Sequence, residues 1–317
     1  MLLSVREVLQ LSRRCFVAAG FDEGAATANA RRVWWAEAYK RTGLSTLHDL
    51  LESFPDLDPD REELRRHNPL VSVIDSGTRP GVAASTPALD LSCAHADAHG
   101  IGIAYATAGP EDPSRPLLGH VAYDAAERGF HAVLLQGGAA DSRTVVAAPE
   151  QPRPLVAECE LPSPSESYRL VRDVVDAGLD HRRHNPLAQA FFDGEAGEEA
   201  YATADARLAD RLLCRSVEPA GRAADEPGFV VLCLDPSHPF HSSEIWQVAE
   251  RFVTGDDRLE VYRPEALQER VGELVENGVE VDRAVWRDVF EFSKGVLAPP
   301  FEGSEQGAGF GLNDLTE

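Results

Sequence analysis

Two short segments of the sequence combine side chains that can bind a metal ion or transfer a proton. In the first, Cys93, His95 and His99 follow the spacing C-x-H-x3-H. On a helix this spacing places both imidazoles on one face, where they could ligate the same metal ion. No glutamate completes an H-E-x-x-H motif, and His99, directly before Gly100, also suits the end of a helix, where a cation is favourable. We therefore favour a structural role for these residues over a metal site.

The second segment follows residues 229–234, an apolar run that predicts a buried strand. Asp235, His238 and His241 come directly after it, and strand ends often present site residues in α/β folds. An imidazole next to a carboxylate could act as a general acid or base. The intervening prolines are also typical of a turn whose polar side chains face water, and we favour the turn.

The cysteines carry no motif of their own. There are five, an odd number without a C-x-x-C pair, which indicates reduced thiols rather than a disulfide framework. Cys15 and Cys233 lie in apolar runs, where a free cysteine behaves as a small buried hydrophobic residue. The glycines at 307–311 follow no predicted strand, so they do not form a dinucleotide-binding loop, and no P-loop, G-x-S-x-G or kinase signature occurs.

The charge of the chain limits its partners. Of 317 residues, 53 are acidic and 30 are Lys or Arg, which gives a formal net charge of −23; its lysines are Lys40 and Lys294. This acid surplus disfavours binding to nucleic acid and to anionic membranes, whose phosphates attract clustered cations. It is typical of a surface adapted to high salt, which screens the repulsion between like charges. The scarcity of lysine could instead reflect a GC-rich genome.

The sequence also predicts where the protein resides. It contains no run of about 20 apolar residues that could span a membrane. Arg6 and Glu7 occupy positions where a signal peptide has its apolar region. A chain of this length that is 43% hydrophobic can bury a core without disulfides or metals. We therefore expect a globular cytoplasmic protein.

The elements that must position these residues begin with a helical arm. Ser4 and Glu7 form a capping box before an apolar stripe, which predicts the first helix. Asp22 caps the second helix and Ser45 starts the third. We expect these helices over 4–19, from 22 to Thr42-Gly43, and over 45–54, followed by a polar connector over 55–68.

Beyond the connector, strands and helices alternate, which favours a layered α/β core. Thr86 and Pro87 start one of the helices, because proline suits a first helical turn. The expected strands lie at 70–74, 101–106, 131–135, 144–148, 154–157, 229–234 and 259–262. The expected helices lie at 86–99, 117–128, 163–178, 242–253, 264–276 and 283–293, with two more across 186–217. This pattern gives an N-terminal helical arm (1–68), a central α/β domain (69–228), a C-terminal strand and helices that pack back on the arm (229–297), and a flexible acidic tail (298–317).

One hexapeptide occurs twice. Arg-Arg-His-Asn-Pro-Leu occupies residues 65–70 and again 182–187. The flanking sequence does not repeat, so we do not infer a duplicated domain. We favour two basic turns that lead into buried elements, and a paired anion-binding feature is the alternative.

Three separated parts of the chain together resemble the malate/L-lactate dehydrogenase family of non-Rossmann oxidoreductases. Residues 5–54 are similar to its N-terminal helices, and residues 71–136 to its central core of helices and strands. Residues 229–236, 262–264 and 277–286 are similar to its closing strand and helix. The resemblance covers roughly two thirds of the chain. It implies a layered mixed-sheet core between N- and C-terminal helical segments, a homodimer, and reduction of a 2-oxo acid or a cyclic imino acid by NAD(P)H.

The chain departs from this family at the residues that carry the reaction. The family uses a histidine within an Asp-Ser-His-Gly motif as acid/base, whereas the corresponding stretch here keeps Ser45 but has Thr46 at the histidine position. Threonine cannot supply a proton at neutral pH. His48 lies two residues further on, which on a helix points it roughly 200 degrees away. The family's Asn-His-Phe-Gly and Lys-Gly-Tyr-Gly segments are also absent.

These observations leave two hypotheses. In the first, the chain is a degenerate relative without the catalytic histidine, which keeps the fold and the dimer and acts as a non-catalytic binding or regulatory protein. In the second, it is an active NAD(P)H-dependent reductase in which His48 or His120 replaces the lost acid. The candidate site residues are therefore Ser45, Thr46, His48 and His120. Residues 307–314 also resemble the end of a bacterial family of unknown function, which implies no activity.

Overall fold

The computed structural model of the chain describes residues 1–57, 63–67, 71–77, 79–109, 111–136, 142–161, 228–235, 237 and 260–296. The helices expected over 163–178, 186–217 and 242–253, the second hexapeptide, His238, His241 and the tail over 298–317 lie outside these residues. The chain forms two compact units, which we call the helical unit (Met1–Asp58 with Glu273–Glu317) and the sheet unit (Pro59–Gly272). The sequence instead placed boundaries after residues 68, 228 and 297.

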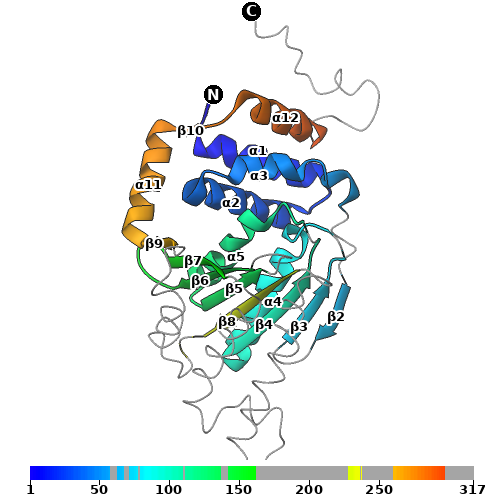
Figure 1. Cartoon of the computed structure of the whole chain (residues 1–317), viewed down its shortest axis with the longest axis vertical. Coiled ribbons are helices and arrows are strands. Elements are labelled where there is room, and N and C mark those ends of the chain that lie inside the picture. The colour runs from blue at the N-terminus through cyan, green and yellow to red at the C-terminus, as the bar shows by residue number, and fades with distance from the viewer. Residues whose placement is uncertain are drawn as a thin grey trace, which may run out of the picture. The chain divides into compact units, whose positions relative to one another are not determined.

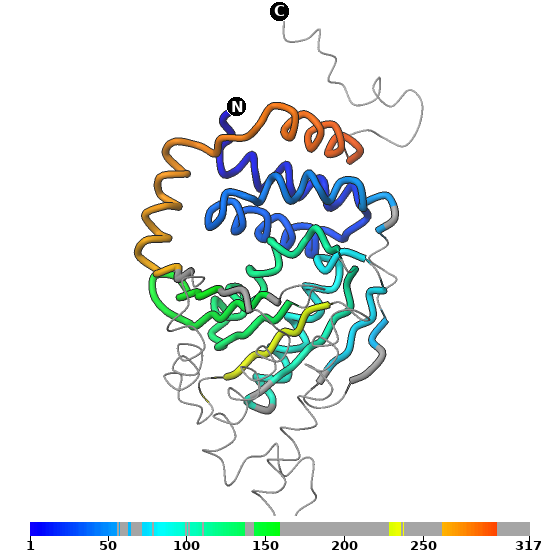
Figure 2. The backbone as a smooth tube through the Cα atoms, in the orientation of Figure 1, coloured from blue at the N-terminus to red at the C-terminus, as the bar shows by residue number. Residues whose placement is uncertain are grey.

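The helical unit is built from its N-terminal helices and a C-terminal helix. Its elements are β1 (Leu2–Leu3), α1 (Val5–Ala18), α2 (Glu23–Lys40), α3 (Gly43–Leu50), a 3-10 helix (Phe54–Asp56), β10 (Val279–Glu280), α12 (Arg283–Ser293) and a 3-10 helix (Lys294–Val296). The predicted capping box of Ser4 and Glu7 starts α1. Strands β1 and β10 pair antiparallel, and α12 packs beside α1 and α3, so the two ends of the described chain meet in one unit (Figure 2).

The core of the helical unit is aromatic. The Phe16 ring lies 5.4 Å from the centroids of both Phe21 and Phe54, and Phe54 lies 5.4 Å from Phe292 of α12. Such ring pairs contribute about 0.5–1.5 kcal/mol each beyond the area that they bury. These contacts fix α12 against the N-terminal helices.

The sheet unit contains eight strands in the order β2-β3-β4-β8-β5-β6-β7-β9 (Figure 1). They are β2 (Glu63–His67), β3 (Val71–Asp75), β4 (Ile101–Thr107), β5 (His131–Gln136), β6 (Ser142–Ala148), β7 (Leu155–Leu161), β8 (Gly228–Leu234) and β9 (Glu260–Tyr262). Strands β3 and β4 are parallel and all other neighbours are antiparallel. The predicted layered α/β fold with a mixed sheet is therefore confirmed.

Two helices cover one face of this sheet. Helix α4 (Val82–His99) packs on β4 and β8, and α5 (Arg115–Glu127) packs on β5 and β6, while the two helices also contact each other (Figure 1). Every residue of β5 and β8 is buried, as their apolar runs predict. Helix α11 (Pro264–Asn277) follows β9 and leads from the sheet unit into the helical unit. Among the described helices, none is long and apolar enough to cross a membrane.

Three expectations about local structure are wrong. Strand β2 lies in the segment expected to be a polar connector, because a strand at the edge of a sheet can carry charged residues and so lacks an apolar pattern. Helix α4 begins at Val82, before the expected start at Thr86, and contains Pro87 in its interior. Helix α3 begins at Gly43 rather than Ser45. In both helices the start is set by a carboxylate side chain that lies outside the helix, as described below.

Candidate functional site

The position of α3 is fixed by its first two residues. A Cβ atom on Gly43 would lie 2.0 Å from the Val33 carbonyl oxygen, so only glycine lets α3 approach α2 this closely. The backbone N–H of Leu44 donates to the Glu37 carboxylate at 3.0 Å, whereas Thr42 makes no side-chain cap. A buried glutamate of α2 thus replaces the usual N-cap residue of α3.

Three of the four predicted site residues lie on α3. The Ser45 side chain is exposed, and its hydroxyl donates to the Thr42 carbonyl oxygen at 2.9 Å. Thr46 is only 4% exposed, so its side chain belongs to the packed interior of the helical unit. The position at which the sequence resemblance places an acid/base imidazole therefore carries a buried side chain that does not ionise at neutral pH.

His48 has a carboxylate partner that the sequence did not reveal. Its Nε2 atom lies 3.2 Å from Oδ2 of Asp288 on α12, and its Nδ1 atom lies 3.8 Å from Oδ1 of Asp49. The hydrogen bond from His48, followed by that from Arg287, lowers the pKa of Asp288 from its ordinary value. His48 and Asp288 are 240 residues apart, and their contact depends on the packing of α12 against α3.

The His48–Asp288 pair lines a shallow acidic pocket. Its volume is about 360 Å³, and the other lining residues are Asp49, Leu51 and Glu52. An imidazole oriented by a carboxylate can accept or donate a proton, so the pair could act as a general base or acid. Three carboxylates surround this single imidazole, however, and their charges oppose entry of an anionic substrate.

The fourth candidate, His120, lies in the sheet unit. It is on α5, is 5% exposed, and its ring stands 5.5 Å from the ring of Tyr123. The structure thus brings Ser45, Thr46 and His48 together on one helix and places His120 within the packed interior of the other unit. A buried imidazole on an aromatic neighbour is typical of a core residue.

The side chains of the first metal-binding candidate contact different partners rather than one another. The His95 Nε2 atom lies 3.0 Å from the Ser72 hydroxyl, and Cys93 faces Cys233. No group of three His, Cys, Asp or Glu side chains able to hold a metal ion occurs among the described residues, and the side chain of His99 lies outside them. These contacts favour the structural role.

The Asp235 segment begins as a turn. The Asp235 carboxylate accepts hydrogen bonds from both the backbone N–H and the hydroxyl of Ser237, each at 2.8 Å. This local bonding is the Asx-type arrangement that favours turns. The observation supports the interpretation as a turn as far as the described residues reach.

A buried carboxylate that the sequence did not identify joins the first turns of α4 and α5. Asp112 accepts the backbone N–H groups of Gly81 at 3.0 Å and Ser114 at 2.8 Å, and the Ser114 hydroxyl at 2.6 Å. The Ser114 hydroxyl oxygen in turn accepts the N–H of Val82 at 3.2 Å. Burial raises the pKa of Asp112, against the opposing effect of these hydrogen bonds. This network sets the start of α4. It also means that N–H groups at the starts of α4 and α5, which could bind an external anion, are bound by a carboxylate of the chain itself.

Comparison with known proteins identifies the fold. No protein-family model matches the sequence, and no curated protein matches it. A malate dehydrogenase from Pyrococcus horikoshii superimposes with a TM-score of 0.57 at 14% identity, covering 95% of this chain and 97% of that one. A dehydrogenase from Sinorhizobium meliloti gives 0.58 at 14% identity (92% and 99% covered), and a delta1-piperideine-2-carboxylate reductase from Pseudomonas syringae gives 0.50 at 15% (92% and 99%). The chain therefore has the fold of the malate/lactate dehydrogenases and imino acid reductases.

Proposed function

We propose that this chain is a degenerate relative of the malate/L-lactate-type dehydrogenases that binds a ligand without catalysing its reduction. The observation that carries the proposal is Thr46, a buried and non-ionising side chain at the position of the family's acid/base histidine. We infer that His48 does not replace that histidine, because three carboxylates, those of Asp49, Glu52 and Asp288, line its pocket. The carboxylate of a 2-oxo acid would meet electrostatic repulsion there.

The described cavities of the helical unit differ in their fit to a nicotinamide dinucleotide, whose diphosphate is anionic. One cavity of about 860 Å³ is lined by two arginines and by twice as many carboxylates, those of Glu37, Glu273, Glu280 and Asp282. This lining does not suit a diphosphate. The proposed function therefore includes no hydride transfer, although the related dehydrogenase folds make NAD(P)H the first ligand to test.

A groove between α1 and α2 fits an anionic ligand better. It has a volume of about 510 Å³, within the usual range of small-molecule sites. Arg6, Arg13 and Arg31 line it together with the apolar side chains of Val5, Leu9 and Ala30, and none of its lining residues is acidic. Arg13 is also ion-paired with Glu23 outside the lining. We assign to this groove a small organic anion with an apolar body, such as a medium-chain carboxylate.

Calorimetric titration with octanoate tests the groove. We expect saturable binding that weakens by about tenfold in Arg31→Gln, since a charge-assisted hydrogen bond contributes about 1.5–3 kcal/mol. Arg14→Gln is the matched control, because Arg14 lies on α1 but does not line the groove. Equal affinity in all three proteins, or none at millimolar octanoate, would refute the assignment of the groove.

The absence of catalysis is tested separately by following NADH and NADPH oxidation with 2-oxo acids and cyclic imines, in dilute buffer and in molar KCl. We expect no turnover above the protein-free rate. Quenching of tryptophan fluorescence measures cofactor binding, because Trp34, Trp35 and Trp286 lie in the helical unit. Saturable quenching without turnover would identify the cofactor itself as a retained ligand.

The second candidate function is an active NAD(P)H-dependent reductase, which the His48–Asp288 hydrogen bond of 3.2 Å favours. In that case turnover would be observed, and His48→Gln would abolish it. Lys294→Gln is the control, because Lys294 pairs with Glu291 and does not line the pocket. Turnover that survives in Lys294→Gln but not in His48→Gln would replace the first proposal with the second.

The homodimer, the cytoplasmic location and the adaptation to high salt are further proposals. The net charge of −23 supports the last of these, because added salt screens self-repulsion. Sedimentation velocity measures the oligomeric state. Thermal unfolding between dilute buffer and molar KCl measures the salt effect, and an unfolding midpoint that does not rise with KCl contradicts it.

A further inference from the structure

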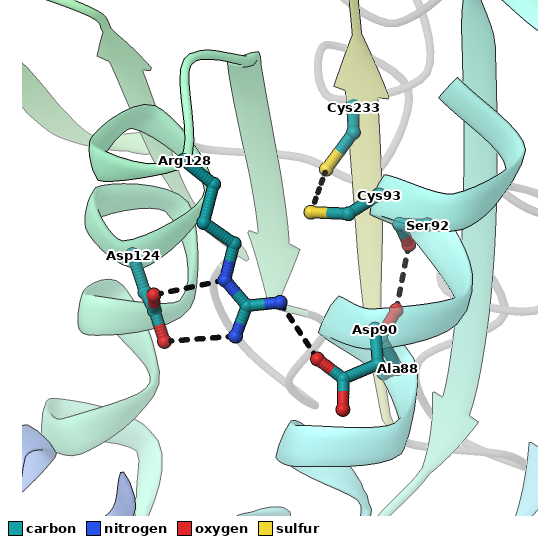
Figure 3. A network of polar contacts seen from close by, with 7 residues as sticks. All are labelled: Ala88, Asp90, Ser92, Cys93, Asp124, Arg128 and Cys233. Atoms are coloured by element: carbon teal, nitrogen blue, oxygen red, sulfur yellow. Dashed lines mark hydrogen bonds and ion pairs between the residues drawn. The ribbon is translucent and has the colours of Figure 1, made fainter. Parts of the chain in front are cut away.

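Two buried sulfur atoms meet in the sheet unit. The Sγ atoms of Cys93 on α4 and Cys233 on β8 lie 3.9 Å apart, although the residues are 140 positions apart in sequence (Figure 3). Cys93 is 6% exposed and Cys233 is fully buried. The described cysteines therefore include one pair in direct contact and one, Cys15, whose thiol instead donates to the Val289 carbonyl oxygen.

The backbone around the two thiols fixes their approach. Gly102 of β4 lies directly opposite Cys233 in the antiparallel register. A Cβ atom on Gly102 would lie 1.9 Å from the Ser92 carbonyl oxygen, so the glycine allows α4 to pack unusually close to the sheet. The Ser92 hydroxyl also donates to the Val231 carbonyl oxygen at 3.2 Å, which ties α4 to β8 at the residue next to Cys93. The contact between the sulfurs is thus built into the packing of α4.

A guanidinium group, turned toward two carboxylates, belongs to the same polar network as the two sulfurs (Figure 3). Arg128 is held by Asp90 at 2.7 Å and by Asp124 at 3.1 Å, and its charge acts on both cysteines (Figure 3). The hydrogen bond with Cys93 and burial together raise the pKa of Cys233 well above its ordinary value. Cys93 is the more accessible of the two sulfurs and is therefore the one that an oxidant would meet first, whereas Cys233 is fully buried.

We propose that Cys93 and Cys233 are an oxidation-sensitive dithiol that a hydroperoxide converts into an intrachain disulfide. The Cys93 thiolate attacks one peroxide oxygen, the O–O bond breaks, and the leaving oxygen takes a proton to give water or an alcohol. The resulting sulfenic acid is attacked by the Cys233 sulfur. The S–S bond forms, the S–O bond breaks, and hydroxide leaves as water with the Cys233 proton. Two electrons pass from the thiols to the peroxide.

The geometry requires a modest movement. An S–S bond is about 2.05 Å long, so the sulfurs must approach by about 1.9 Å. The product would link α4 covalently to β8 and close a loop of 140 residues. Such a loop restricts the unfolded chain strongly, so the oxidised protein should unfold at a higher temperature. This inference is independent of the proposed ligand-binding function.

The test uses the full-length protein under native conditions, treated with hydrogen peroxide and then denatured. We expect the number of thiols that react with a maleimide to fall from five to three, because each disulfide removes two. Non-reducing electrophoresis should show a faster monomer band, and peptide mapping should identify the Cys93–Cys233 link. A dithiol reductant should restore all thiols and the original band.

Single variants decide the assignment. Cys93→Ser and Cys233→Ser should abolish the fast band, while Cys15→Ser, which also removes a buried thiol, should retain it. Arg128→Met should slow disulfide formation several-fold without changing the product. Circular dichroism establishes that each variant is folded, and Cys93→Ala replaces any serine variant that is not. Peroxide-treated protein that keeps five thiols, or a disulfide that maps to other cysteines, would overturn the proposal.

Discussion

The two units place their titratable side chains differently. In the helical unit, the His48–Asp288 pair lies at the surface, with 36% and 42% of the two side chains exposed. In the sheet unit, Asp112, His131 and Cys233 are buried, and burial contributes to the pKa shift of each. The candidate acid/base pair of the helical unit is thus accessible, whereas these three groups of the sheet unit are enclosed.

The difference follows from how each unit is held together. Helices pack through apolar stripes, so their outer faces can change without loss of the fold. In the sheet unit the buried Asp112 joins the starts of two helices, so more of the structure depends on one enclosed polar group. Changes at the exposed side chains of α3 should therefore affect function more than stability, and changes to the buried polar groups at the start of α4 should do the reverse.

The largest expected effects come from two glycines that occupy equivalent roles in the two units. An added Cβ meets a backbone oxygen at 1.9 Å in Gly102→Ala and at 2.0 Å in Gly43→Ala. Because the backbone itself must move, each variant should lose about 3 kcal/mol or more of unfolding free energy. Denaturant unfolding measures both losses.

The Gly102→Ala and Gly43→Ala variants also test whether the two units unfold separately. With Trp246→Phe as background, tryptophan fluorescence reports the helical unit, while far-UV circular dichroism reports both units. If the units are independent, Gly102→Ala should leave the fluorescence transition unchanged and Gly43→Ala should shift it. If both variants shift both signals by the same amount, the two units unfold as one, which would contradict the treatment of the units as independent.

The second prediction concerns the buried carboxylate. Asp112→Asn keeps the shape of the side chain but replaces one carboxylate oxygen with an NH2 group. That group would face an N–H or O–H donor whose hydrogen bond the carboxylate accepts in the wild-type protein. We expect a loss of about 2–3 kcal/mol, measured by denaturant unfolding. Asp288→Asn, in the accessible pair of the other unit, should change stability much less. Equal losses would contradict the contrast between enclosed and accessible carboxylates.

The third prediction is a pH dependence. Burial lowers the pKa of His131 below its ordinary value of 6.5, so the unfolded chain binds its proton more readily. The stabilisation is fully present above pH 6.5 and is lost as pH falls through the lowered folded-state pKa. The unfolding free energy of the wild-type protein should therefore fall more steeply below pH 6.5 than that of His131→Gln. Parallel curves would exclude this assignment.

The smallest expected effect is stabilising. Gly272 lies within α11, and an added Cβ would meet nothing within 4 Å. Gly272→Ala should gain about 0.5–1 kcal/mol, because alanine has the higher helix propensity. Thermal unfolding should detect a small increase in the midpoint. A decrease would mean that α11 makes contacts beyond the described residues.

The sequence predicted the elements whose signals are local. The capping box at Ser4, the apolar run of β8 and the alternation around α5 each depend on neighbouring residues, and each corresponds to an observed element. It missed the edge strand β2 and the start of α4, because the deciding partners are a neighbouring strand and Asp112, 31 residues from Gly81.

The candidate site was predicted only in part for the same reason. The replacement at Thr46 and the proximity of His48 are visible in one stretch of sequence. The partner Asp288 is not, because only the packing of α12 on α3 brings it within hydrogen-bonding distance. The Cys93–Cys233 contact is likewise a property of the packed sheet.

The place of β8 in the sheet has a consequence for synthesis on the ribosome. The strands made earlier form two separate groups, β2-β3-β4 and β5-β6-β7, and β8 lies between β4 and β5 in the finished order. Until residues 228–234 emerge, β4 and β5 each expose an unpaired edge of buried, apolar sequence. The nascent sheet unit therefore passes through a stage in which its two halves must be protected from other chains, and the late strand β8 joins them.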